Sequence, residues 1–178
     1  MSEQEMILRM VGISKAFPGV QALDDVSFEV AAGEVLGLVG ENGAGKSTLM
    51  KILSGAYRKD AGRIFLQGRE IDIQNPHHAQ RLGIAIIYQE FNLTPNQTAA
   101  ANIFIGREPR RLRLGRLVSF VDRRGMEREA QEHLDRVGAR VPATALIRDL
   151  SVAEQQMVEV AKALAVDARI IIMDEPTS

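Results

Sequence analysis

The chain has 178 residues, the length of a single domain, and its hydrophobic content of 46% is enough to fill a buried core. Its 22 basic and 23 acidic residues leave a formal charge of −1, so no overall field attracts nucleic acid, and the absence of cysteine excludes disulfides and cysteine-zinc sites. The polar, acidic start is unlike a secretory signal, and no apolar run approaches the ~18 residues that a membrane span needs.

Short apolar segments occupy the first part of the chain. Residues 7–13 and 26–30 are predicted as early strands that pair antiparallel at the edge of a sheet. Residues 34–39 are predicted as a buried strand, and residues 63–66 as a short strand before a turn at Gly68.

A glycine-rich stretch with the pattern G-x-x-x-x-G-K-[ST] follows residues 34–39 and leads into a helix predicted from residue 47 to 53. Glycines let the backbone turn tightly so that N–H groups point at a phosphate, and the helix N-terminus adds about half a positive charge. Lys46 can reach the β- and γ-phosphates, and the Ser47 hydroxyl can ligate Mg²⁺. The sequence therefore predicts a nucleoside triphosphate site made of Gly40, Glu41, Asn42, Gly43, Ala44, Gly45, Lys46, Ser47 and Thr48.

Strands and helices continue to alternate after this loop. Asn75 and Pro76 are the N-cap and first residue of a helix predicted to reach about Leu82. Residues 84–88 and 169–173 are predicted as buried strands. This alternation indicates an α/β fold with a mostly parallel central sheet and an antiparallel edge.

Helical signals replace strand signals in the middle of the chain. Apolar residues recur with helical spacing from Met126 to Val137, and Gly138 can end that helix. We therefore predict an inserted helical lobe at residues 90–160, within an α/β nucleotide-binding core formed by residues 1–89 and 161–178.

Two further stretches can carry chemistry. The strand at residues 169–173 delivers Asp174 and Glu175 to its carboxyl end, where α/β sheets bind ligands. Asp174 can hold Mg²⁺ there and Glu175 can act as a general base on water, the alternative being a plain polar turn. Ser151 begins either an ordinary capped helix or a second anion site for a γ-phosphate offered by another subunit.

The order of these motifs resembles the ATP-binding-cassette ATPases, which are P-loop NTPases. The resemblance covers essentially the whole chain. Four motifs occur in the family's order: the phosphate loop, Tyr88-Gln89-Glu90, Leu150-Ser151 and the final Met-Asp-Glu-Pro-Thr-Ser. Residues 17–23, 83–90 and 101–108 are similar to the first cassette of bacterial monosaccharide importers of the ribose, xylose and galactose type.

This resemblance implies a role for each matching residue. By its position in the family pattern, Phe17 stacks on adenine. Considered without the resemblance, Phe17 could equally be an aromatic residue of the hydrophobic core. Gln89 approaches Mg²⁺ and the attacking water, and Ser151 contacts ATP bound to the opposite cassette. The implied cofactors are ATP and Mg²⁺, with Glu175, Lys46 and Gln89 as catalytic residues and Ser47, Gln89 and Asp174 as metal ligands.

The chain departs from the family pattern in two places. Residues 152–154 are Val-Ala-Glu where the usual signature has Gly-Gly-Gln, and a carboxylate there repels a γ-phosphate. We therefore hypothesise that the two composite ATP sites of the assembly are unequal. The chain also stops at Ser178, before the histidine that contacts the γ-phosphate in the family, so we expect a C-terminally truncated piece with poor activity of its own.

Five arginines crowd one part of the expected helical lobe. Either they line a solvated loop, or they contact a transmembrane partner or anionic headgroups. They are Arg107, Arg110, Arg111, Arg113 and Arg116.

The resemblance implies an ATP-hydrolysing subunit of a bacterial importer for a sugar, expected to be a monosaccharide. Expected partners are a second nucleotide-binding cassette, transmembrane permease subunits and, indirectly, a periplasmic sugar-binding protein, with no nucleic acid. The expected location is the cytoplasmic face of the inner membrane, as a peripheral protein. Two rival hypotheses are a soluble cassette ATPase without a transporter and a nucleotide-binding regulatory module that does not hydrolyse ATP.

Overall fold

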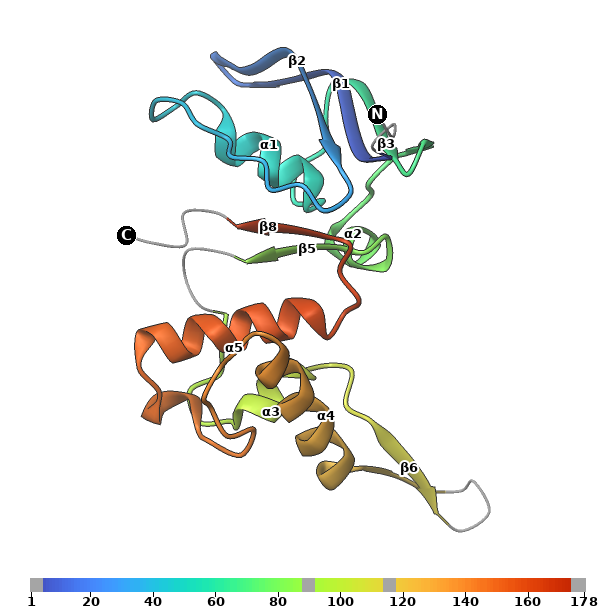
Figure 1. Ribbon diagram of the computed structural model, residues 1–178. Coiled ribbons are helices and arrows are strands. Elements are labelled where there is room, and N and C mark those ends of the chain that lie inside the picture. Colours follow the sequence, from blue (N-terminus) through green and yellow to red (C-terminus); the bar gives the residue numbers. More distant parts are fainter. Residues whose placement is uncertain (1–4, 88–91, 114–117, 174–178) are drawn as a thin grey trace. The chain divides into compact units, whose positions relative to one another are not determined.

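The computed structural model describes residues 5–87, 92–113 and 118–173, without the side chains of residues 111–119 (Figure 1). The chain forms two compact units, Met1–Ile84 and Ala85–Ser178. Among the described residues, no helix combines the length and the apolar character that crossing a membrane requires.

An antiparallel sheet of four strands dominates the first unit. Its strands are β1 (Met6–Phe17), β2 (Val20–Ala31), β3 (Ala61–Leu66) and β4 (Arg69–Ile71), in the order β2-β1-β3-β4. Side chains alternate between the faces of a strand, and this period buries Leu8 and Met10 on β1 beside Leu66 and Ile64 on β3. The predicted strands at residues 7–13, 26–30 and 63–66 are thus present, and all three are longer than expected.

Two helices complete the first unit, and both start and stop where local signals place them. Helix α1 (Lys46–Leu53) buries Leu49, Ile52 and Leu53, and Gly55 follows it with φ +76°. A Cβ on Gly55 would lie 2.5 Å from the backbone of Asn75, so only glycine fits. Helix α2 (Pro76–Arg81) is capped by the Asn75 side chain, which accepts a 2.9 Å hydrogen bond from the His78 N–H.

The prediction of a buried strand at residues 34–39 is wrong for this structure. No strand forms there, and the side chains of Val35 and Val39 are 96% and 92% exposed. A buried strand of a parallel sheet needs hydrogen-bonded neighbours and covering side chains, and none of β1 to β4 pairs with this segment. The segment is apolar enough to form a buried strand, but no strand of the first unit pairs with it.

Three helices form the core of the second unit: α3 (Ala99–Ile103), α4 (Arg123–Arg136) and α5 (Val152–Leu164). They pack through small and branched residues that include Ala99, Ile103, Ala130, Leu134, Val158 and Ala161. Helix α4 ends before Gly138, which has φ +70°, as its sequence predicts.

Strands β5 (Ile84–Ile87) and β8 (Ile170–Met173) are neighbours in a two-stranded sheet, and their arrows point the same way in Figure 1. Ala85 and Ile87 of β5 pack with Ala163 of α5 and with Ile171 of β8. This pair carries the parallel character that the alternation of elements predicts.

Two strands interrupt the segment that the sequence predicts to be helical. Strands β6 (Arg110–Arg113) and β7 (Val118–Val121) pair antiparallel, with Arg110 opposite Val121. Among the side chains that the structure describes on these strands, the two apolar ones, Phe120 and Val121, are 57% and 45% exposed. Arg107 is exposed in the segment between α3 and β6, and its guanidinium donates hydrogen bonds to the carbonyls of Ile103 (3.1 Å) and Ala165 (2.9 Å).

Candidate functional site

The loop of residues 40–48 ends in the N-terminus of α1, which no side chain caps. Gly43 and Gly45 have φ of +88° and +86°, and Gly45 is the N-cap residue. Helices α2 to α5 each have an N-cap side chain that accepts a backbone hydrogen bond, so among the described α-helices only α1 lacks one. Its first turn also holds no acidic residue. The free N–H groups and the helix dipole therefore favour an anion at this position.

Lys46 folds back over the same loop. Its Nζ donates hydrogen bonds to the carbonyl oxygens of Gly40 (2.6 Å) and Glu41 (2.9 Å), which closes the loop into a ring. The Ser47 side chain next to it is exposed. A phosphate entering the ring would offer Lys46 anionic oxygens in place of neutral carbonyls, and charge-assisted hydrogen bonds are the stronger kind.

Gly45 is fixed by its contact with strand β2 as well as by its backbone angle. A Cβ at this position would lie 2.4 Å from the carbonyl oxygen of Ala22 and 2.7 Å from Leu23 Cδ2. Gly43 has the same sign of φ, but a Cβ there would meet nothing within 4 Å. The loop is therefore held against the sheet at Gly45, whereas at Gly43 there is room for a Cβ.

We expect Gly45→Ala to destabilise the first unit by more than the ~1 kcal/mol that a positive φ alone costs an alanine, because backbone must also move. Gly43→Ala is the matched control and should lose only that smaller amount. Urea unfolding followed by circular dichroism measures both. Equal losses for the two variants would contradict the close approach at Gly45.

Phe17 lies at the end of β1 and pairs with an aromatic residue that the sequence analysis did not single out. Its ring meets Tyr57 edge to face, with centroids 5.3 Å apart and planes at 67°. The ammonium of Lys15 lies 5.5 Å from the Phe17 centroid. Phe17 is only partly buried, and Tyr57 follows α1, so the two rings belong to the same unit as the phosphate loop. The stacking of Phe17 on adenine stays a prediction.

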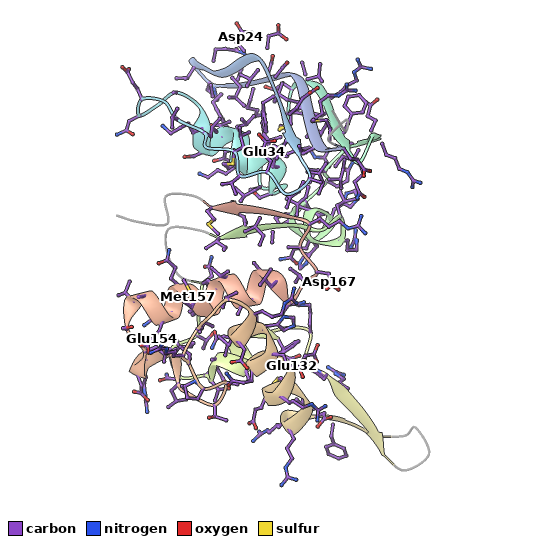
Figure 2. The ribbon with its side chains drawn as sticks, viewed as in Figure 1. Asp24, Glu34, Glu132, Glu154, Met157 and Asp167 are labelled. Atoms are coloured by element: carbon purple, nitrogen blue, oxygen red, sulfur yellow. The ribbon has the colours of Figure 1, made fainter. Side chains whose placement is uncertain are left out.

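Ser151 begins α5, as predicted, and its partner is a carboxylate. The Glu154 side chain accepts hydrogen bonds from the Ser151 hydroxyl and backbone N–H, both at 2.7 Å, while the Ser151 hydroxyl accepts one from the Glu154 N–H at 3.4 Å. This capping box lies at the start of α5, where Figure 2 labels Glu154. A negative charge thus already occupies the helix N-terminus where the resemblance places a γ-phosphate.

The capping box gives a pH dependence with a defined sign. Hydrogen bonds from the Ser151 hydroxyl and then from its N–H lower the pKa of Glu154. A carboxyl with a lowered folded pKa stabilises the fold above its unfolded pKa, about 4.3, and this contribution is lost as the pH falls through the folded pKa. In an NMR titration, the Ser151 amide signal should therefore shift with a midpoint below that value. Glu154→Gln should abolish the titration, and a midpoint at or above the ordinary value would contradict the assignment.

The predicted residues Gln89, Asp174 and Glu175 lie outside the described residues. The strands that precede them are described: β5 ends at Ile87 and β8 at Met173. Because these strands are parallel neighbours, their carboxyl ends share one edge of the sheet, the edge that binds ligands in α/β folds. The roles of the three residues stay predictions.

Comparison with known proteins places this chain among ABC proteins. The family described as ABC transporter matches residues 23–178. The chain is 55% identical over 178 residues to a ribose import ATP-binding protein of Streptomyces avermitilis, covering 100% of this chain and 33% of that protein. It is 58% identical over 172 residues to a ribose import ATP-binding protein of Rubrobacter xylanophilus, covering 97% of this chain and 33% of that protein. The chain thus spans about a third of the length of these curated relatives.

Solved structures agree on the fold. A nucleotide-free ATP-binding cassette from an ABC transporter superposes with a TM-score of 0.81 at 29% identity, covering 97% of this chain and 70% of the other. An ADP conformation of such a cassette gives a TM-score of 0.81 at 28% identity, with the same two coverages. The predicted fold class, an incomplete P-loop NTPase cassette, is confirmed.

Proposed function

The chain belongs to the ABC transporter family, and from this premise we propose that it is the nucleotide-binding part of an importer ATPase that couples ATP hydrolysis to uptake of a monosaccharide. Because the chain spans about a third of its relatives, the activity proposed is that of the whole protein. The proposal that the imported substrate is a monosaccharide is supported by relatives that are named as ribose import ATP-binding proteins.

The observation that carries the proposal is the uncapped N-terminus of α1 with Lys46 over it. Within the described part of the chain, the Lys46 ammonium donates to backbone carbonyls only, at 2.6 and 2.9 Å, and Ser47 is exposed beside it. We propose that residues 40–48 wrap the phosphates of ATP with their N–H groups, and that Lys46 transfers its hydrogen bonds to phosphate oxygens. Phe17 would hold the adenine by stacking.

The donor set fits Mg²⁺, which prefers hard oxygen ligands and is held by one or two protein groups together with substrate phosphates. Ser47 offers an exposed hydroxyl, Asp174 a carboxylate and Gln89 an amide oxygen. Mg²⁺, when bound, neutralises phosphate charge. We propose that Glu175 takes the proton of the attacking water, and that Gln89 orients this water.

The remaining roles concern the assembly. We propose that a second cassette closes on the first so that Ser151 contacts the partner's ATP, and that permease subunits dock the pair on the cytoplasmic face of the membrane. A periplasmic sugar-binding protein would deliver the sugar to the permease. We also propose the division into a core of residues 1–89 and 161–178 with an inserted lobe at residues 90–160.

Uptake measurements test this function. The whole protein and its permease, reconstituted in vesicles, should import labelled ribose, xylose or galactose only when ATP is supplied on the cassette side. A non-hydrolysable ATP analogue is the control and should give no uptake. ATP hydrolysis without uptake of any sugar would favour a cassette ATPase without a transporter, and ATP binding without hydrolysis would favour a regulatory module.

A further inference from the structure

Phe17 is held at two points, its ring and the backbone just before it, and a different residue holds each. The ring meets that of Tyr57 edge to face, with centroids 5.3 Å apart. The backbone is held by Asp60, whose Oδ2 accepts a 2.8 Å hydrogen bond from the Ala16 N–H. These residues all lie in the first unit. Because Phe17 is only partly buried, part of its ring stays open to a ligand.

Asp60 binds three consecutive residues at the end of β1. Besides the bond from Ala16, its own N–H donates to the Ser14 carbonyl at 2.9 Å, and its Oδ1 accepts from the Lys15 Nζ at 2.6 Å. The Lys15 ammonium held in this way lies 5.5 Å from the centroid of the Phe17 ring, within the range of a cation–π attraction. Asp60 therefore fixes both the backbone before Phe17 and a cation beside its ring.

Tyr57 connects the aromatic pair to the helix that begins at the phosphate loop. Its N–H donates a 3.0 Å hydrogen bond to the carbonyl of Lys51, which lies in the last turn of α1. Gly45 is the N-cap of the same helix. Because the turns of a helix are joined by hydrogen bonds, α1 is a stiff spacer between its two ends. Tyr57 thus relates the position of the Phe17 ring to that of the phosphate loop.

We propose that Tyr57 and Asp60 are positioning residues for nucleotide binding, which hold Phe17 in place for the adenine base. Tyr57 acts on the ring and Asp60 on the backbone. A ring that is held in advance loses less freedom when a base stacks on it, and this raises the affinity. The effect is confined to the base, because neither residue belongs to the loop of residues 40–48. The proposal rests on the proposed function for the stacking of adenine on Phe17.

Magnetic resonance on the chain without nucleotide tests the two contacts directly. Tyr57→Leu keeps an apolar side chain but removes the ring, so the ring-proton signals of Phe17 should shift, and Tyr57→Phe should restore them. Asp60→Ala leaves the Ala16 N–H without its acceptor, so its hydrogen should exchange about 10-fold faster. Unchanged Phe17 signals in Tyr57→Leu, or unchanged Ala16 exchange in Asp60→Ala, would overturn the proposal.

Calorimetric binding of Mg-ATP and of inorganic tripolyphosphate separates the base from the phosphates. Tyr57→Leu and Asp60→Ala should each weaken Mg-ATP binding by about 3- to 10-fold, the range expected for one aromatic pair, and leave tripolyphosphate binding unchanged. Phe17→Ala should lose as much, and adding Tyr57→Leu to it should cost little more. Glu70→Ala is the control and should change neither affinity. Glu70 is an exposed acid of β4, in the row of residues that pairs with Arg9 at the other end of β1.

The two ligands also separate the ways in which the proposal can fail. Equal losses for Mg-ATP and tripolyphosphate would give Tyr57 and Asp60 a purely structural role and overturn the proposal. Unchanged Mg-ATP affinity in Phe17→Ala would overturn it too, since the base would then not stack there. If the parent bound neither ligand, the proposed function would fail instead, and with it the role of both residues. Because the variants act at different contacts, Asp60→Ala decides the question if Tyr57→Leu does not fold.

Discussion

Lys46→Ala is expected to remove measurable ATP binding. The ammonium makes two hydrogen bonds to neutral carbonyls, at 2.6 and 2.9 Å, and ATP would give it charged oxygens instead. Hydrogen bonds to charged groups contribute about 1.5–3 kcal/mol each, so losing two of them weakens binding by about 100-fold or more. Calorimetric titration with Mg-ATP measures this loss.

Lys51→Ala is the matched control for this prediction. Lys51 lies in the last turn of the same helix, and its ammonium is 5.4 Å from the Tyr57 ring. Because it is far from the N-terminus of α1, its loss should leave affinity within about threefold, which is under 1 kcal/mol. Thermal melting checks that both variants fold. Unchanged affinity in a folded Lys46→Ala variant would refute the assignment of the phosphate loop.

Local chemistry made much of this fold predictable. Asn75 caps α2, Ser151 caps α5, and Gly55 follows α1 with a positive φ, each at the place that its residue type indicates. Caps and left-handed positions depend on a few neighbouring residues, so one sequence is enough to find them. The resemblance then identified the family, since it depends on ordered motifs and not on packing.

Features that depend on distant parts of the chain were not predictable in this way. The run at residues 34–39 has the composition of a buried strand, but it forms no strand because it has no paired neighbour among β1 to β4. Strands β6 and β7 pair with each other inside a segment whose neighbours have helical patterns, and their described apolar side chains, Phe120 and Val121, are exposed.

The candidate site was predictable only as a set of motifs. Tyr57, whose ring meets that of Phe17, was missed because it belongs to no motif. The signature motif that begins at Leu150 could not show that the Glu154 carboxylate already accepts a hydrogen bond from the Ser151 hydroxyl, at 2.7 Å.

Glu175→Gln, made in the whole protein, is expected to retain ATP binding and lower turnover by about 10²–10⁴-fold, the range typical of a general base. An amide cannot take the proton of the attacking water, whereas Lys46 and the N–H groups of residues 40–48 are untouched and still hold the phosphates. Single-turnover hydrolysis and retention of labelled ATP on a filter measure the two effects separately. Glu132→Gln, at an exposed acid of α4, is the control and should hydrolyse ATP normally. Normal turnover in Glu175→Gln would remove it as the base.

The same substitution decides whether the two proposed ATP sites are unequal. Glu154 places a carboxylate at the start of α5, and a γ-phosphate presented there by the partner must displace it or be repelled. The ATP that faces this signature should therefore be held less well than the ATP at the other composite site. Replacing the catalytic glutamate of each cassette in turn should then lower the total ATPase rate by different factors. Equal losses would show that the Ser151–Glu154 capping box opens without cost when the cassettes close.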